Sequence, residues 1–216
     1  MIDTVVFDLD GTLLDTLNDL YNSVNYALRT HHLPERSVVE VRQFLGNGIR
    51  SLMLNAVGDA VDEPHFEEVF QSFRTHYMEH CLDTTQPYDG IMPLLEALKN
   101  RNVKMAIVSN KLHPAVQELS QRFFDGFISS AVGESKTVRR KPNPDAVLAA
   151  LHEMKSDKAH AIYVGDSEVD FTTANNADMP CALVTWGFRD EAFLRLLPLK
   201  ENTSFIHHPK ELLSLL

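Results

Sequence analysis

The sequence predicts an α/β protein, a Rossmann-like parallel sheet core with helices on both faces and an inserted α-helical domain. Three observations predict this class. Short β-branched or aromatic runs recur along the chain, helical patterns lie between them, and one long stretch shows helical periodicity alone. A length of 216 residues suits one substantial core together with a smaller second unit.

Five runs have the composition of buried strands. They are Thr4–Leu9, Val103–Ser109, Phe127–Val132, Ala161–Val164 and Ala182–Val184. The expected helices between them are Pro93–Asn100, Pro114–Phe124, Pro144–Met154 and Val169–Asn176. Three of these helices begin at or near a proline, which is favoured in the first turn. Strands that alternate with helices predict a parallel sheet, because parallel neighbours are joined by crossovers.

The alternation stops between about Asp15 and about Pro87, where no convincing strand is found. Two apolar stripes recur there at helical spacing: Leu17, Leu20, Tyr21, Val24, Ala27 and Leu28, and then Phe66, Val69, Phe70, Phe73 and Tyr77. Such stripes are typical of helix faces that pack on each other. We therefore expect residues 1–14 and 87–216 to form the α/β core and residues 15–86 to form a helical domain.

Charge and composition exclude several classes of protein. The formal net charge of −10 argues against a nucleic-acid partner, because phosphate backbones are bound by basic surfaces. No apolar run approaches the roughly 18 residues of a membrane span, and the N-terminus lacks the features of a secretion signal. Cys81 and Cys181 are isolated and have no metal-ligand spacing. We expect a cytoplasmic protein, a monomer or a homodimer, with neither a nucleic-acid nor a membrane partner.

Two aspartates lie near the end of the first expected strand. Asp8 and Asp10 are two residues apart and precede the turn residues Gly11 and Thr12. Side chains two apart point to the same side of a strand, and ligands of open α/β sheets bind beyond the carboxyl ends of the strands. Because an Asp-Gly pair is also a common turn, turn formation alone would account for Asp10 but not for Asp8.

A second pair of aspartates follows the fourth expected strand. Asp166 and Asp170 are four residues apart where a helix should begin, so they share a face. Oxygen ligands gathered at two strand ends predict a Mg²⁺ site. The alternative is a helix N-cap, formed by Asp166 or Ser167, with acidic residues in the first turn.

Two further polar positions stand at the boundaries of expected elements. Ser109 ends the second strand and is followed by Asn110; its hydroxyl can donate to a phosphate oxygen, cap a helix or serve a turn. Lys141 precedes Pro142, which biases the lysine away from helical backbone and so fixes how its ammonium is presented. A lone exposed lysine would instead be a solvated charge.

These four elements, in this order on successive strand ends, resemble the haloacid dehalogenase-like hydrolase superfamily. The first motif matches residues 8–12 (DLDGT), the second Ser109, the third Lys141, and the fourth Asp166 with Asp170. The resemblance covers essentially the whole chain. It implies that residues 15–86 form the small α-helical cap of this family, and the rest its phosphatase core.

The resemblance also implies a mechanism. Asp8 would attack phosphorus and form an aspartyl-phosphate. Asp10 would protonate the leaving alcohol and later deprotonate the attacking water, and Lys141 would pair with Asp8 and with the phosphate.

Metal and substrate ligands follow from the same resemblance. The Mg²⁺ site would comprise the Asp8 carboxylate, the Asp10 backbone carbonyl, Asp166 and, in a supporting role, Asp170. Thr12 and Ser109 would hydrogen-bond the phosphoryl oxygens, and Asn110 is expected among the substrate-binding residues.

Within the family, Asp10 favours phosphoryl chemistry, because members that cleave carbon–halogen bonds lack the second aspartate. The region 15–86 contains no lysine, which argues against members that cleave carbon–phosphorus bonds through a cap lysine. Its segment 44–50 (FLGNGIR) resembles the specificity loop of phosphoglycolate phosphatases. There Gly46 would let the backbone approach substrate and Arg50 would bind a carboxylate or second phosphate. The alternative is a helix–helix turn with a surface arginine.

We therefore expect a Mg²⁺-dependent phosphatase for a small phosphate monoester such as 2-phosphoglycolate. The alternatives are a sugar phosphomutase of the same fold, a pyrophosphatase, or a binding protein without catalysis. A mutase differs mainly in how its cap excludes water, which the sequence does not reveal.

Overall fold

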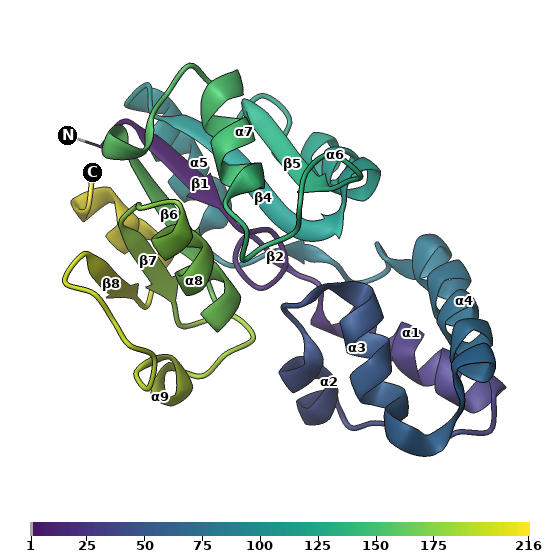
Figure 1. Cartoon of the computed structure of the whole chain (residues 1–216). Helices are drawn as coiled ribbons and strands as arrows, with labels where there is room; N and C mark the ends of the chain where they lie inside the picture. Colours follow the sequence, from purple (N-terminus) through teal and green to yellow (C-terminus); the bar gives the residue numbers. More distant parts are fainter. Residues whose placement is uncertain (1) are drawn as a thin grey trace. The chain divides into compact units, whose positions relative to one another are not determined.

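The computed structural model describes residues 2–216 (Figure 1). The chain divides into two compact units. The larger comprises the N-terminal segment up to Leu14 together with Pro87–Leu216, and the smaller comprises Asp15–Gln86.

The larger unit is built on a six-stranded parallel sheet in the order β5-β4-β1-β6-β7-β8. Its strands are β1 (Thr4–Phe7), β4 (Lys104–Leu112), β5 (Ser130–Glu134), β6 (Ala161–Gly165), β7 (Cys181–Val184) and β8 (Thr203–Ile206). This parallel α/β architecture confirms the fold class predicted from the sequence. Every residue of the central strand β1 is buried, as its β-branched and aromatic sequence predicts.

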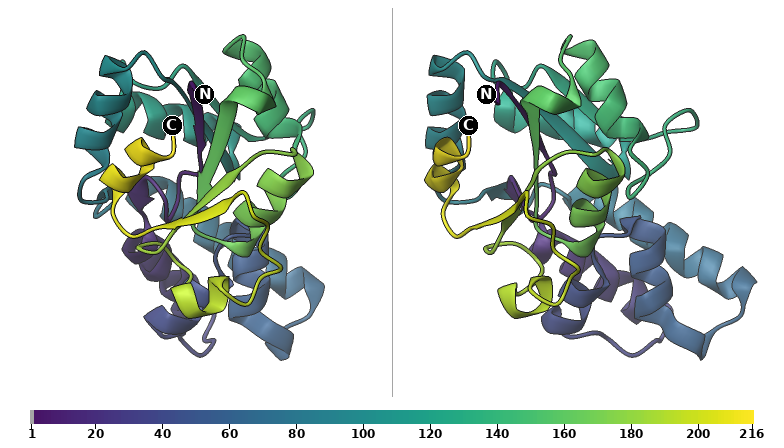
Figure 2. Two further views of the ribbon diagram at one scale, coloured as in Figure 1. Left: turned by 90° about the vertical axis from the view of Figure 1, so that its left-hand side faces the viewer. Right: turned by 60° about the vertical axis from the view of Figure 1, so that its left-hand side comes forward.

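Helices cover both faces of this sheet. They are α5 (Ile91–Asn100), α6 (His113–Phe124), α7 (Asp145–Glu153), α8 (Glu168–Asn176), the short α9 (Glu191–Leu194), and the 3-10 helices η2 (Lys158–His160) and η3 (Pro209–Ser214). Figure 2 shows α7 and α8 on one face and α5 with η3 on the other. Apolar residues of α7 and α8, such as Val147 and Phe171, form a buried cluster with Val6 and Tyr163 of the sheet.

Some strand predictions need correction. The strand β8 was not expected, because three of its four residues are only half-buried and its sequence has no long apolar run. The run expected from Phe127 begins as a turn after α6, where the Phe127 N–H donates to the Phe124 carbonyl, and the strand starts at Ser130. Strand β4 continues to Leu112, three residues beyond its expected end.

The smaller unit is helical. It contains α1 (Leu17–Thr30), α2 (Val38–Phe44), α3 (Gly48–Val57), the 3-10 helix η1 (Gly58–Ala60) and α4 (Glu63–His80). Helices α1 and α4 pack along each other and bury the central residues of both predicted stripes, among them Val24 and Phe73. The buried Asp19 carboxylate of α1 accepts hydrogen bonds from the N–H and hydroxyl groups of Thr84 and Thr85, which fixes the end of this unit.

Two short strands lie where the chain passes between the units. Strands β2 (Leu14–Asp15) and β3 (Gln86–Pro87) pair with each other. The expectation that this stretch contains no strand is therefore wrong at its two ends, because two-residue strands give no periodic signal. Among the residues that the structure describes, no helix combines the length and the apolar character that crossing a lipid bilayer requires.

Candidate active site

The candidate site lies at the carboxyl ends of three neighbouring strands. Phe7, the last residue of β1, pairs with Ile107 of β4 and with Val164 of β6. Asp8 therefore follows the central strand one residue before the level at which its neighbours reach Ser109 and Asp166. The parallel register thus brings together residues that are more than a hundred positions apart in the sequence.

Three buried carboxylates and one ammonium form the centre of the site. Asp8, Asp166 and Asp170 each offer an oxygen, and these oxygens lie within 4.8 Å of one another. Lys141 Nζ lies 2.8 Å from Asp8 Oδ1 and 2.7 Å from Asp170 Oδ1. The lysine side chain is only 3% exposed, so it is not the solvated surface charge that was the alternative.

The electrostatics of the cluster follow from its burial. Burial and the nearby Asp170 raise the pKa of Asp8 well above its ordinary value, although Lys141 opposes this shift. Burial and Asp170 likewise raise the pKa of Asp166 to about 7. For Lys141, burial lowers the pKa, but the carboxylates of Asp170 and Asp8 more than offset it and raise the pKa above its ordinary value. One ammonium therefore does not balance three carboxylates.

A divalent cation fits this charge imbalance. The donors are all carboxylate oxygens, which Mg²⁺ prefers. They are buried and close together, and mutual repulsion helps raise the pKa of Asp8 and Asp166. A cation bound among them would relieve that repulsion.

Asp170 also accepts hydrogen bonds from groups at the start of α8. The Ser167 hydroxyl donates to Asp170 Oδ2 at 2.6 Å, and the Ser167 and Asp166 N–H groups reach the same oxygen at 3.1 and 3.2 Å. Ser167 is the N-cap of α8 and forms a capping box with Asp170. The helix N-cap that was considered as an alternative is therefore present, and Ser167 rather than Asp166 forms it. The carboxylate cluster exists beside it.

Tyr163 is a member of the site that the sequence analysis missed. It lies in the buried strand β6, and its hydroxyl donates to Asp170 Oδ1 at 3.0 Å and accepts from Lys141 Nζ at 3.2 Å. In the sequence it stands inside the apolar run Ala161–Val164 and reads as one more buried strand residue. The available signal was the phenolic hydroxyl, since a buried tyrosine needs a polar partner.

Asp166 is oriented by the loop that follows β7. The Phe188 N–H donates to Asp166 Oδ2 at 2.7 Å, and the Thr12 hydroxyl donates to Oδ1 at 3.3 Å. Two glycines allow this close packing. A Cβ at Gly11, whose φ is +87°, would lie 2.6 Å from Asp166 Oδ2, and one at Gly187 would lie 2.3 Å from Asp166 Cβ.

Of the expected phosphate ligands, Ser109 and Asn110 both contact neighbouring lysines. The Ser109 hydroxyl oxygen accepts from the Lys111 N–H at 3.2 Å. The Asn110 amide group accepts from the Lys141 N–H at 2.6 Å and donates to the Lys141 carbonyl at 3.2 Å. Asn110 thus positions Lys141 across the site, and its role in substrate binding stays a prediction.

Asp10 is not part of the three-carboxylate cluster. Both of its carboxylate oxygens lie 2.9 Å from the Nζ of Lys111, a residue that the sequence analysis did not select. Lys111 follows Ser109 and Asn110 directly in β4. A run of three polar residues that ends an otherwise apolar strand was the signal that could have identified it.

In the helical unit, segment 44–50 joins α2 to α3, which agrees with the alternative of a helix–helix turn. Gly46 has a φ of +109°, a conformation that favours glycine. Arg50 makes two hydrogen bonds to Glu67, and its guanidinium lies 5.1 Å from the ring centre of Phe66 and 5.4 Å from that of Phe70. The side chain is about half exposed, at 48%.

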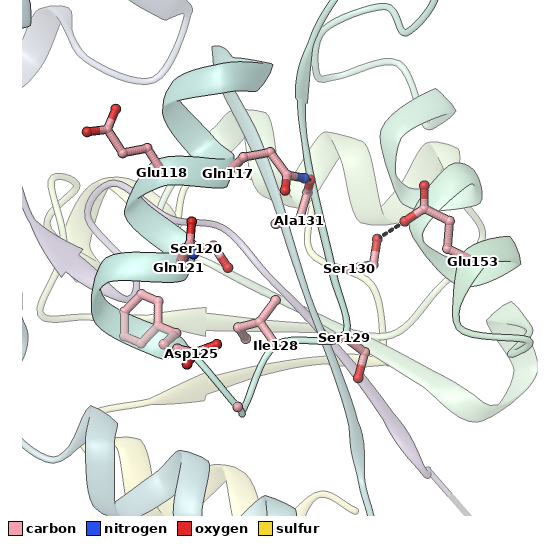
Figure 3. Close-up of a pocket in the computed structure, with 12 residues that line it drawn as sticks. Gln117, Glu118, Ser120, Gln121, Asp125, Ile128, Ser129, Ser130, Ala131 and Glu153 are labelled. Carbon is pink, nitrogen blue, oxygen red and sulfur yellow. Dashed lines mark hydrogen bonds between the residues drawn. The ribbon is translucent and has the colours of Figure 1, made fainter.

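A large hollow in the α/β core does not coincide with the carboxylates. Figure 3 shows this groove of about 680 Å³, which is lined by residues of α6, the segment before β5, β5 itself and Glu153 of α7. Its polar groups are partly occupied: the Ser130 hydroxyl donates to Glu153 at 2.5 Å, and the Gln117 amide donates to the Ala131 carbonyl at 2.5 Å. None of the cluster residues lines it, so the site is identified by its chemistry and not by the size of the hollow.

A family model and several known proteins are similar to this chain over most of its length. Residues 5–184 match a family model described as haloacid dehalogenase-like hydrolase. A phosphoglycolate phosphatase of Aquifex aeolicus is 34% identical, with 85% of each chain covered. An N-acetylmuramic acid 6-phosphate phosphatase of Pseudomonas aeruginosa is 30% identical, with 98% of this chain and 93% of that one covered. A candidate phosphoglycolate phosphatase of Lactobacillus delbrueckii, solved by crystallography, superposes with a TM-score of 0.91 at 30% identity, covering 97% of this chain and 96% of its own.

Proposed function

Since this chain belongs to the haloacid dehalogenase-like hydrolase family, we propose that it is a Mg²⁺-dependent phosphatase for a small monoester of the 2-phosphoglycolate kind. The relatives named phosphatase support the reaction class, and those named phosphoglycolate phosphatase support the substrate. The observation that carries the proposal is the buried Asp8 carboxylate, bound by Lys141 at 2.8 Å beside Asp166 and Asp170.

Asp8 is the proposed nucleophile. Its Oδ1 accepts hydrogen bonds from the Leu9 N–H at 2.7 Å and from Lys141 at 2.8 Å, which together fix the orientation of the carboxylate. A carboxylate oxygen attacks phosphorus, the bond from phosphorus to the ester oxygen breaks, and its electron pair stays on the leaving oxygen. The product of this step is an aspartyl-phosphate on Asp8.

Asp10 is the proposed acid and base. It lies two residues beyond the nucleophile, with a side chain that is 21% exposed and so accessible to a substrate or to water. It gives a proton to the leaving oxygen in the first step. In the second step it takes a proton from the water that attacks the aspartyl-phosphate, which releases phosphate and restores Asp8.

Mg²⁺ is the proposed cofactor, with the Asp8 and Asp166 carboxylates and the Asp10 backbone carbonyl as ligands. Asp170 has a supporting role. Lys141 and the Ser167 hydroxyl both bind its carboxylate and hold it beside Asp166. Mg²⁺, when bound, supplies positive charge that offsets the charge of the transferring phosphoryl group.

The remaining proposed contacts concern substrate. Lys141 pairs with the phosphoryl oxygens as well as with Asp8, while Thr12, Ser109 and Asn110 are the polar groups proposed to bind phosphate. In the helical unit, Gly46 and Arg50 are proposed to contact the part of the substrate beyond the phosphate. A sugar phosphomutase remains the alternative, and product analysis separates the two, because a mutase returns a phosphorylated sugar and no free phosphate.

A panel of phosphate esters tests the proposal. The panel includes 2-phosphoglycolate, N-acetylmuramic acid 6-phosphate and p-nitrophenyl phosphate, each with Mg²⁺ and each after chelation. We expect phosphate release that requires the metal and that D8N abolishes while its thermal unfolding shows an intact fold. Full turnover after chelation, or a D8N variant as active as the parent, would contradict the proposal.

A further inference from the structure

Lys111 has a fixed position at the edge of the candidate site. Its side chain is only 7% exposed, and its Nζ lies 2.9 Å from both carboxylate oxygens of Asp10. The backbone around it is also constrained. The Lys111 N–H donates to the Ser109 hydroxyl oxygen at 3.2 Å, and a Cβ at Gly133 of β5 would lie 2.6 Å from the Lys111 carbonyl oxygen.

The ion pair with Asp10 places the Lys111 ammonium on the side of the site where the leaving oxygen is expected. A general acid works within about 2.6–3.2 Å of the oxygen that it protonates. If Asp10 protonates the leaving oxygen, that oxygen therefore comes within about 6 Å of Lys111 Nζ. An anionic group on the carbon next to the leaving oxygen can then come within ion-pairing distance of this ammonium.

The two buried lysines differ in what they bind. Lys141 lies between Asp8 and Asp170, the carboxylates around the phosphorus position. Lys111 is bound instead to Asp10, the group on the leaving side. A lysine ammonium is a compact charge with three donors, so it can bind a carboxylate without the paired geometry that an arginine requires.

We propose that Lys111 is a specificity-determining residue that binds a carboxylate on the carbon bearing the phosphate ester. This inference rests on the proposed phosphatase function and on Asp10 as its acid. It names the substrate class as short 2-phosphorylated carboxylic acids. It also locates part of the anion recognition in the α/β core, in addition to the contact proposed for Arg50 in the helical unit. A sugar phosphate whose acid group is remote from the ester would gain little from Lys111.

The test compares two substrates that differ only beside the leaving oxygen. In 2-hydroxyethyl phosphate, a hydroxymethyl group replaces the carboxylate of 2-phosphoglycolate. For K111M, we expect kcat/KM to fall about 10- to 100-fold more with 2-phosphoglycolate than with 2-hydroxyethyl phosphate, the range of a lost charged hydrogen bond. Most of the additional loss should be in KM, and K111R should restore part of it because it keeps the charge.

K158M is the matched control, since Lys158 is an exposed lysine paired with Asp178 at 2.9 Å on the surface. It should leave both substrates unaffected. An equal loss with both substrates in K111M would assign Lys111 only to holding Asp10 and would overturn the inference, as would no loss with either. If K111M does not fold, K111Q decides: a larger loss with 2-phosphoglycolate than with 2-hydroxyethyl phosphate supports the inference, and an equal loss with both opposes it. Wild-type protein that hydrolyses neither ester, nor any other in the panel, would remove the proposed function itself.

Discussion

The charged groups of the α/β core and those of the helical unit are placed in very different environments. In the core, Lys141 is 3% exposed and lies between two buried carboxylates. In the helical unit, Arg50 and Glu67 form an ion pair in which both side chains are about half exposed, at 48% and 49%. Solvent screens the second pair and hardly reaches the first. The core charges are therefore held in fixed positions by buried partners, whereas the pair between Arg50 and Glu67 is open to solvent.

Removing Lys141 should give the largest effect. In K141M, Asp8 and Asp170 would remain buried without their ammonium, which costs about 3–5 kcal/mol of unfolding free energy. Activity should fall by about 10²-fold or more, because the cation beside the nucleophile and the phosphate is lost. Urea denaturation and steady-state kinetics measure the two effects. A K141M variant of parental stability would show that the pair between Lys141 and the carboxylates contributes little.

Metal binding should depend on pH in a defined direction. The pKa of Asp166 is raised from 3.8 to about 7 in the folded protein, chiefly by burial. Without metal, the stability linked to this group is therefore fully present below the unfolded pKa and is lost as pH rises through about 7. Because Mg²⁺ binds the ionised carboxylate, its stabilising effect should grow over the same interval.

Thermal unfolding with and without Mg²⁺ at pH 5.5 and pH 8 checks this prediction. The rise in Tm caused by Mg²⁺ should be larger at pH 8, and D166N should lose most of it. A rise of equal size at both pH values would mean that ionisation of Asp166 does not limit metal binding.

Tyr163 should have a smaller effect within the core. Y163F removes one hydrogen bond to Asp170 and one from Lys141 while keeping the ring in β6. We expect a loss of about 1–2 kcal/mol in unfolding free energy, because the acceptor that it leaves is charged. Chemical denaturation measures it, with Y88F as a control at a tyrosine outside the cluster. A neutral Y163F would indicate that Asp170 is held sufficiently by Lys141 and Ser167.

Arg50 should give the smallest effect and one confined to binding. R50A should raise KM about tenfold or less for an anionic ester and leave kcat almost unchanged, as for an exposed charge that contacts substrate and not the reacting atoms. R42A in α2 of the same unit is the control. Kinetics with 2-phosphoglycolate and with p-nitrophenyl phosphate provide the comparison, and equal changes in KM for both esters would count against a role in anion binding.

The sequence predicted the centre of the site because its signals are local. Asp8 lies near the end of one run that reads as a strand, and Asp166 lies two residues beyond the end of another. Parallel strands bring such ends together. Lys141 was identified by its place before Pro142 in a motif. The order and the register of the strands were not predicted, since neither is encoded in any single segment.

The parts that the sequence did not reveal depend on contacts across long separations. The Phe188 N–H that binds Asp166 is a backbone group, which no residue type marks. Tyr163 lies within β6, where its apolar neighbours dominated the interpretation. Lys111 lies in the part of β4 that extends beyond the expected end of that strand. The edge strand β8 is mostly half-buried, so it has neither the continuous apolar run of a central strand nor a strong alternation.

Trapping the covalent intermediate on Asp8 is the strictest test of the proposed aspartyl-phosphate mechanism. Wild-type protein is mixed with its best ester and Mg²⁺, quenched in acid within a single turnover, digested and analysed by mass spectrometry. We expect phosphate on the peptide that contains Asp8, formed before product release and absent in D8N. Phosphate on a different residue, or complete turnover with no phosphorylated protein at any time, would contradict it.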